Sequence, residues 1–329
     1  MSVQKGILGN QNNIRHMKEA AEKGRLPHAY ILTGPEGSGK RTFAGYMASA
    51  LLCEEGVRNG PCGICPSCIK AKTHNHPDII WTFHEKPTVL SVSEIRDQVV
   101  STIYTAPYYG PYKIYIITDA QLLNEHGQNA LLKTMEEPPE YVLIFLLTDN
   151  ADALLDTIRS RCIRLDMESL DSKTIEEALI KDGALPEEAA ACASFSRGNL
   201  GCAKELAEGG PFRELRDETV KTLKNLKNLD ALEIFQKSAE LDKVSGRKVL
   251  DMILKWYRDV LILKAGEGEW PLYYGNDRSV IRSQAEIISY EGLEKIICQT
   301  EESRKRLLAG VKPEAVFETL FLQIREEYR

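Results

Sequence analysis

A short apolar run followed at once by a glycine-rich loop and an amphipathic helix constrains this chain more than any other feature. The run is Ala29–Thr33, the loop is GPEGSGK (34–40), and Phe43, Met47 and Leu51 then recur at helical spacing. In such a loop, backbone N–H groups at a helix N-terminus can surround phosphate oxygens. Because a strand precedes it and a helix follows, we expect a phosphate site in an α/β domain. A glycine turn that binds no ligand is the alternative.

Further apolar runs alternate with periodic segments in the first half of the chain. The apolar runs are 79–83, 113–118, 141–147 and 163–165, and the helix-like segments between them include 93–103 and 125–135. Strands that alternate with helices indicate a parallel sheet covered on both faces. Residues 1–166 are therefore expected to form a RecA-like α/β domain.

Past Asp166 the strand pattern stops and helical periodicity takes over. Three short helices, 172–181, 186–195 and 200–207, are expected within 167–209. Longer amphipathic segments follow at 215–226, 231–241, 249–264, 285–299 and 313–327, with 266–276 as the clearest loop. We therefore expect a small three-helix domain at 167–209 and an all-helical domain at 210–329.

The charge distribution argues against an autonomous binder of duplex DNA. Residues 1–165 contain 17 Lys+Arg and 17 Asp+Glu, and the remainder contains 25 against 31. Since phosphate neutralisation supplies most of the affinity for DNA, a protein partner is the better expectation. The longest apolar run, 142–147, is far shorter than the roughly 20 residues that cross a bilayer, and residues 1–8 lack an apolar signal core. A cytoplasmic protein without membrane contact is expected.

Two positions that ATP hydrolysis requires are altered. The phosphate-loop consensus places Ser or Thr directly after the lysine, where its hydroxyl coordinates magnesium, but here Arg41 follows Lys40. Thr42 comes one residue later, so its side chain is rotated about 100° around the helix from the consensus position. An acidic pair should also follow the strand at 113–118, and Asp119 is followed by Ala120. We therefore expect hydrolysis to be lost and a relic or regulatory nucleotide pocket to remain.

Four of the eight cysteines fall within sixteen residues, at Cys53, Cys62, Cys65 and Cys68. Four thiolates close a tetrahedral Zn²⁺ shell with no open position, and a reducing cytosol favours metal over disulfides. A structural zinc site is predicted. Free thiols, a redox pair, or His74 or His76 in place of one cysteine are the alternatives. Small buried hydrophobes are expected at the other four cysteines, Cys162, Cys192, Cys202 and Cys298.

An arginine precedes the last predicted strand. Arg161 lies in TIRSRC (157–162), at the edge of the α/β domain. In ring-forming NTPases an arginine so placed can reach a neighbour's γ-phosphate and stabilise the charge that spreads over it during transfer. The alternative is a solvated or salt-bridged arginine at a domain edge.

Together these motifs resemble the clamp-loader branch of the AAA+ ATPases and, within it, the delta-prime subunits of bacterial DNA polymerase III. The resemblance covers nearly all of residues 1–210. It rests on RLPHAYILTGPEGSGK (25–40), the four-cysteine insertion, HPDII (76–80), NALLKTMEEPPEYVLIFLLT (129–148) and IRSRC (158–162). It implies an AAA+ domain at 1–166, a lid at 167–209 and an oligomerisation collar at 210–329, although the helical remainder carries no diagnostic motif.

The resemblance also implies a role in DNA replication. Clamp loaders are hetero-pentamers that use ATP to open a sliding clamp and close it around primer-template DNA; the gamma/tau subunits hydrolyse ATP, and delta-prime subunits commonly do not. In this family a Ser-Arg-Cys motif, matched here by 160–162, supplies an arginine finger to an adjacent subunit. Arg161 is therefore the expected catalytic residue in trans. Gamma/tau and delta subunits, the clamp and DNA are the implied partners.

A third departure concerns the lid. In the segment 198–201 (GNLG), glycine stands where active subunits carry a phosphate-sensing arginine. The three losses favour a non-hydrolysing delta-prime-like subunit over a gamma/tau-like motor, and the acidic balance disfavours a freestanding zinc-dependent DNA-binding protein. If ATP or ADP is bound, the expected contacts are the loop with the start of its helix, Asp119 after one strand, and the family's sensor position at Thr148. The full set is Gly34, Gly37, Ser38, Gly39, Lys40, Arg41, Thr42, Asp119 and Thr148.

Overall fold

A five-stranded parallel sheet organises the first part of the chain. The computed structural model describes residues 7–84, 89–239, 241, 243–266 and 272–328. The strand order is β2-β3-β4-β1-β5, and all five strands expected from the sequence are confirmed. They are β1 (Ala29–Thr33), β2 (Ile79–Trp81), β3 (Lys113–Ile117), β4 (Val142–Thr148) and β5 (Ile163–Asp166).

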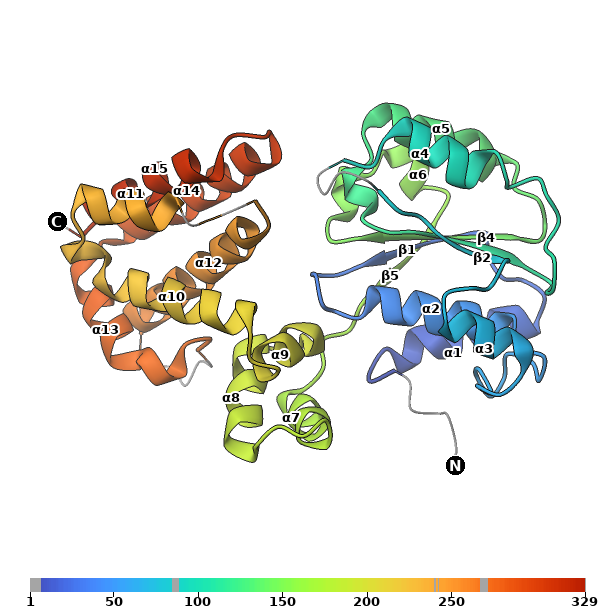
Figure 1. Ribbon diagram of the computed structural model, residues 1–329, viewed down its shortest axis with the longest axis horizontal. Coiled ribbons are helices and arrows are strands. Elements are labelled where there is room, and N and C mark those ends of the chain that lie inside the picture. The colour runs from blue at the N-terminus through green and yellow to red at the C-terminus, as the bar shows by residue number, and fades with distance from the viewer. Residues whose placement is uncertain (1–6, 85–88, 240, 242, 267–271, 329) are drawn as a thin grey trace. The chain divides into compact units, whose positions relative to one another are not determined.

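Helices cover both faces of this sheet (Figure 1). On one face lie α1 (Gln11–Glu22), α2 (Lys40–Leu51) and α3 (Pro66–Lys72), and on the other lie α4 (Val92–Ile95), α5 (Glu125–Glu136) and α6 (Asp156–Arg159). Shorter elements are the π-helical turn η1 (Arg96–Val100) and the 3₁₀ turns η2 (Ala120–Leu122) and η3 (Ala151–Ala153).

Alternate residues of β1 pack into separate cores on the two faces. Tyr30 and Leu32 contact the core that α2 lines with Phe43, whereas Ala29 and Ile31 belong to the opposite core. Because both faces are covered, all five positions of the strand are buried and the run is continuously apolar.

The register of β1 determines where its loop emerges. Thr33 pairs with Thr148 of β4 on one side and with Asp166 of β5 on the other, all in parallel. The carboxyl ends of parallel strands meet at one edge of the sheet, where α/β proteins bind ligands. The glycine-rich loop therefore leaves the sheet beside Thr148.

The described chain forms two compact units, Met1–Thr174 with Gly198–Gly201, and Ile175–Arg197 with Cys202–Arg329. No strand occurs among the described residues of the second unit. The finer division into a lid and a collar stays a prediction. The helices after β5 are α7 (Ser172–Lys181), α8 (Pro186–Ser196), α9 (Leu200–Ala207), α10 (Pro211–Asn225), η4 (Leu226–Asn228), α11 (Ala231–Ala239), α12 (Lys243–Ala265), η5 (Gly275–Asp277), α13 (Arg278–Ile287), α14 (Tyr290–Leu308) and α15 (Pro313–Glu326).

Large aromatic side chains with polar tips form the core of the second unit. Trp256 is fully buried, and its Nε1 donates to Oε1 of Gln284 at 2.7 Å. The hydroxyls of Tyr257 and Tyr328 lie 2.9 Å apart, also buried. These bonds satisfy the polar tips and so allow the rings to be buried. No described helix combines the length and the apolarity needed to cross a membrane.

Two expectations about this unit are wrong. The single helix expected at 285–299 is two helices, because the Ser289 side chain caps α14 by accepting a hydrogen bond from the N–H of Gly292 at 2.9 Å. Cys298 is exposed, since the buried stripe of α14 runs through Leu293, Ile296 and Thr300 and leaves position 298 on its polar side.

Of the other scattered cysteines, Cys192 is buried, and Cys162 and Cys202 are half-buried. Within the expected loop 266–276, residues 267–271 lie outside the described residues.

Candidate functional site

Left-handed glycines shape the phosphate-type loop after β1. Gly37 and Gly39 have φ values of 80° and 88°, a conformation that other residues rarely adopt. Gly39 is the N-cap of α2, and no side chain caps this end of the helix. The N-terminal N–H groups of α2 can therefore donate to an anion that binds at this end of the helix.

Lys40 is held by its own loop. Its Nζ donates to the carbonyl oxygens of Gly34 and, at 2.8 Å, of Pro35. Burial lowers the pKa of Lys40, and the carboxylates of Asp149, Asp119 and Glu36 partly oppose this shift. A phosphate group would have to displace the two carbonyls to reach the amine.

The hydroxyl of Ser38 supports a fit between this loop and a polar ligand. Its Oγ is buried and has no hydrogen-bond partner among the described residues. An unsatisfied buried hydroxyl is costly, so a phosphate oxygen in the loop would give it a partner. Its place inside the loop agrees with the expectation for Ser38, whose role in nucleotide binding stays a prediction.

A distant segment, Gly198–Gly201, packs directly on the loop, and we call it the strap. The amide of Asn199 donates to the carbonyl oxygen of Glu36, and the N–H of Gly201 donates to the carbonyl oxygen of Gly37 at 3.1 Å. A Cβ at position 201 would lie 2.7 Å from the Cα of Gly37. This arrangement therefore has no room for an arginine at 201 unless the backbone moves.

Asp119 and Thr148 lie at the carboxyl edge of the sheet, as expected, but their surroundings differ. Asp119 is 46% exposed, and its Oδ2 lies 3.5 Å from Nε2 of His84. Ala120 is buried at the start of η2, so no carboxylate stands next to Asp119. Thr148 is fully buried, and its Oγ1 donates to the carbonyl oxygen of Asn150 at 2.8 Å.

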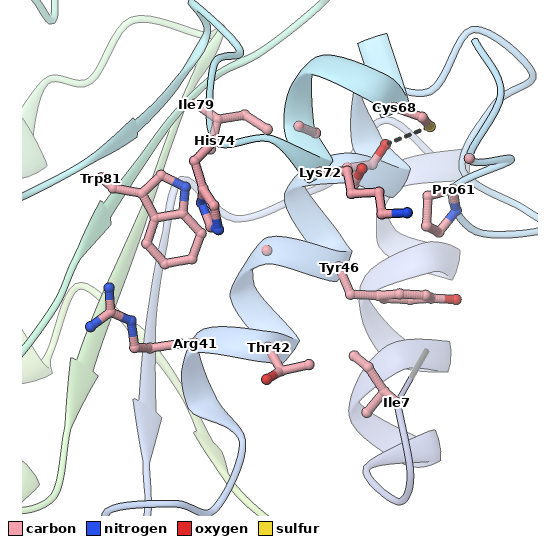
Figure 2. A pocket seen from close by; sticks show the side chains of 14 residues that line it. Ile7, Arg41, Thr42, Tyr46, Pro61, Cys68, Lys72, His74, Ile79 and Trp81 are labelled. Atoms are coloured by element: carbon pink, nitrogen blue, oxygen red, sulfur yellow. Dashed lines mark hydrogen bonds between the residues drawn. The ribbon is translucent and has the colours of Figure 1, made fainter. Parts of the chain in front are cut away.

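Arg41 and Thr42 both line a cavity between α2 and α3 (Figure 2). The guanidinium of Arg41 lies over the ring of Trp81, 5.7 Å from its centroid, in a cation–π arrangement. No sequence pattern indicates this contact, because β2 and α2 are far apart along the chain. A contact of Arg41 or Thr42 with nucleotide stays a prediction.

Arg161 is paired within the chain. Its guanidinium donates to Oε1 of Glu136 at 2.9 Å and to the carbonyl oxygen of Thr157 at 2.8 Å, and its side chain is 35% exposed. The neighbouring Arg159 pairs with Asp152 at 2.7 Å and with Asp156. Exposed ion pairs contribute about 0–1 kcal/mol, so the pair with Glu136 can be exchanged for a stronger anion.

The four clustered cysteines converge on one point after the end of α2. Their Sγ atoms all lie within 4.8 Å of one another, and Sγ of Cys62 is 4.0 Å from Sγ of Cys68. Tetrahedral zinc with Zn–S bonds of about 2.3 Å requires sulfur atoms roughly 3.8 Å apart. None of the four forms a disulfide, and their geometry fits a shared ion.

Backbone N–H groups point at the sulfur atoms of this cluster. The N–H of Cys62 donates to Sγ of Cys53 at 3.4 Å, that of Cys65 to Sγ of Cys62 at 3.3 Å, and that of Cys68 to Sγ of Cys65 at 3.4 Å. Such donors stabilise the charge of metal-bound thiolates. Burial raises the pKa of Cys53 and raises that of Cys68 to about 12; burial also acts on Cys65, but N–H groups and neighbouring thiols outweigh it and lower its pKa to about 7.

Neither nearby histidine belongs to the cysteine cluster in this structure. In the buried ring of His76, Nε2 lies 3.0 Å from Oγ of Ser67 and Nδ1 accepts a hydrogen bond from the N–H of Asp78. The ring of His74 stands edge-on to Trp81, with centroids 5.2 Å apart. Among the described residues the cysteines alone form the donor set.

Two family descriptions match the chain. Residues 9–171 match the family described as "DNA polymerase III, delta subunit", and residues 211–326 match "DNA polymerase III, delta subunit, C terminal". The DNA polymerase III subunit delta' of Bacillus subtilis is 30% identical over 311 residues, which cover 93% of each chain. The subunit tau of Escherichia coli is 34% identical over 173 residues, which are 53% of this chain and 26% of that protein.

A solved structure from Thermotoga maritima, a DNA polymerase III gamma subunit-related protein, is also similar. It is 18% identical, and the match covers 96% of this chain and 99% of that chain with a TM-score of 0.44.

Proposed function

Since the chain belongs to the family of DNA polymerase III delta-prime subunits, we propose that it serves in a clamp loader as a subunit that does not hydrolyse ATP itself. In this proposal it assembles with gamma/tau and delta subunits in a cytoplasmic hetero-pentamer. The chain acts on the sliding clamp and primer-template DNA through this complex. The division into an AAA+ domain (1–166), a lid (167–209) and a collar (210–329) is part of the proposal.

The observation that best supports the absence of ATP hydrolysis is the packing of the strap on the phosphate loop. The 2.7 Å separation between a Cβ at 201 and the backbone of Gly37 leaves no place for a phosphate-sensing arginine. Ala120 and Arg41 add the loss of a second carboxylate and of the magnesium hydroxyl. Gly37, Gly39, Ser38 and Lys40 still fit a phosphate, so ATP or ADP can bind without being cleaved.

We assign the catalytic contribution to Arg161, acting on the nucleotide of an adjacent subunit. Its guanidinium would exchange Glu136 for the γ-phosphate oxygens of that nucleotide. A fixed positive charge there stabilises the charge that develops on these oxygens during transfer. Glu136 then acts as the in-chain partner when no neighbour is docked.

The four cysteines would hold a structural Zn²⁺ as thiolates. Four protein ligands leave no open position for water, so the ion supplies folding stability and no reaction chemistry. The N–H groups that donate to the sulfur atoms of Cys53, Cys62 and Cys65 would keep the ligands oriented.

The decisive test is ATP turnover with and without ring partners. In the reconstituted complex, Arg161→Ala should lower turnover at the neighbouring site by about 10³-fold, and the variant chain should stay folded. Arg159→Ala is the matched control, because it removes an arginine two residues away that pairs with Asp152 and Asp156. The control should leave turnover near the wild-type value.

The purified chain alone separates this proposal from a gamma/tau-like motor. It should show no Mg²⁺-dependent hydrolysis above background. Brisk hydrolysis that disappears in Lys40→Ala would identify an active ATPase and refute the proposal. Equal turnover by the wild-type complex and by the complex that carries Arg161→Ala would refute the arginine-finger assignment alone.

A further inference from the structure

A cavity of about 440 Å³ lies between α2, α3 and the end of β2 (Figure 2). Its walls include Trp81 from β2, Tyr46 from α2, and Lys72 from the end of α3. Pro61, Gly63 and Cys68 of the cysteine module close it on another side. Its volume is within the range of small-molecule sites in proteins, about 300–1,000 Å³.

Aromatic rings form one end of the cavity. The His74 ring meets the indole of Trp81 at 72°, so the two rings make a corner. His74 has a φ of 55°, a conformation that residues other than glycine seldom adopt, and this directs the ring onto the indole. Gly45 of α2 packs against the indole, since a Cβ there would lie 3.4 Å from the ring, in ordinary van der Waals contact.

Positive charge surrounds the same cavity. The guanidinium of Arg41 stands beside Trp81 at one end, and Lys72 lies at the other end near Tyr46 (Figure 2). Nζ of Lys18, on α1, donates to the Tyr46 hydroxyl at 3.4 Å, although Lys18 does not itself line the cavity. None of the described residues that line the cavity is acidic. A bound molecule is therefore expected to be anionic.

We propose that this cavity binds a nucleoside phosphate, with its base stacked at Trp81 and its phosphate paired with Lys72. A flat heteroaromatic ring suits the corner of His74 and Trp81, because stacking on aromatic side chains accepts any base. The phosphate would reach the ammonium group of Lys72 at the opposite end. Two sources share this chemistry, a free nucleotide and the terminal nucleotide of a DNA strand. The cavity adjoins the start of α2 through Arg41 and Thr42, but neither Lys40 nor the glycines of the phosphate loop line it. It does not depend on the proposed role in the assembly.

The test is calorimetric titration of the full-length chain with adenosine 5′-monophosphate and with a short 5′-phosphorylated oligothymidylate. At least one of them should bind, and should bind more tightly than adenosine or inorganic phosphate. Lys72→Ala and Trp81→Leu should each weaken that binding about tenfold. Lys70→Ala, on the same helix but outside the cavity, is the matched control and should bind as the wild type does. Binding of the mononucleotide identifies a free nucleotide; binding of the oligonucleotide alone identifies a strand end.

Lys40→Ala separates this cavity from the phosphate loop, because any binding that it removes belongs to the loop. The binding that Lys72→Ala weakens should persist in Lys40→Ala. The proposal is overturned if neither probe binds, if Lys40→Ala abolishes binding, or if Lys72→Ala binds as tightly as the wild type. Lys72 is exposed, so its replacement keeps the test valid even if Trp81→Leu does not fold.

Discussion

The two ends of α2 carry two sites of opposite kind. Before its N-terminus lies a loop that has the backbone of a phosphate site but lacks several of the groups that hydrolysis needs. Two residues after its last residue, Leu51, begins a cysteine cluster whose donor set is complete. The cluster takes all four candidate ligands from sixteen consecutive residues, whereas the loop is hydrogen-bonded to Thr148 of β4 and to Gly201 of the strap. A site whose ligands all come from one short segment is retained or lost as a whole. A site built from several segments can lose one of its groups at a time.

The largest effect is expected at the complete end. Cys65→Ser should reduce the zinc content from about one ion per chain to none and lower the free energy of unfolding by roughly 4 kcal/mol or more, since metal binding is coupled to folding. Elemental analysis and urea denaturation measure the two quantities. Cys298→Ser is the control, because Cys298 is exposed and outside the cluster. A metal-free wild-type protein of full stability would remove the contrast between the two ends.

An intermediate effect is expected where the strap meets the loop. Gly201→Arg should lower the free energy of unfolding by about 1–3 kcal/mol, because the new Cβ would collide with the backbone of Gly37. It should not create ATPase activity in the isolated chain, although it restores an arginine. Thermal unfolding and an ATPase assay test both points.

A glycine in open space provides the reference for this substitution. A Cβ at Gly275 would meet no atom within 4 Å, so Gly275→Ala should change stability far less than Gly201→Ala. If Gly201→Arg is as stable as the wild type, the strap can move away from the loop, and the incomplete end is more adaptable than its packing indicates.

The smallest effect is expected at Lys40. At pH 7, Lys40→Met should change the free energy of unfolding by no more than about 1 kcal/mol, because two lost hydrogen bonds are offset by relief of a buried charge. Burial lowers the pKa of Lys40, so the unfolded chain binds this proton more tightly than the folded chain. Wild-type stability should therefore rise with pH, relative to the variant, from the lowered pKa up to the ordinary value of 10.5. Denaturation curves at several alkaline pH values would show this; a relative fall would contradict it.

Local sequence patterns were sufficient for the sheet, the loop and the cysteine cluster. The buried strands β1, β3 and β4 are almost entirely apolar because both faces of the sheet are covered, whereas the edge strand β5 (IRLD) exposes three of its four residues. The cysteines are neighbours in the chain. The substitutions at Arg41 and Ala120 could also be read directly, since a consensus position defines what is missing. The break before α14 had a signal, Ser289 three residues before Gly292, that hydrophobic periodicity alone overlooked.

Contacts between distant segments could not be predicted in this way. Nothing in the sequence pairs Arg161 with Glu136, places Arg41 on Trp81, or brings Asn199 to Glu36. These contacts depend on the order of strands in the sheet and on the path of the chain after β5. They decide how the candidate residues are held, so the surroundings of these residues were the part that the sequence could not predict.

The strap also has a consequence for how the chain matures. The Asn199 amide and the Glu36 carbonyl that it reaches are 163 residues apart, so during synthesis the loop leaves the ribosome long before its cover exists. Until then the nascent chain presents an uncovered loop whose glycines are free to sample many shapes. A fragment that ends at Asp166 would preserve this early form and would show how much of the final shape of the loop is imposed from outside.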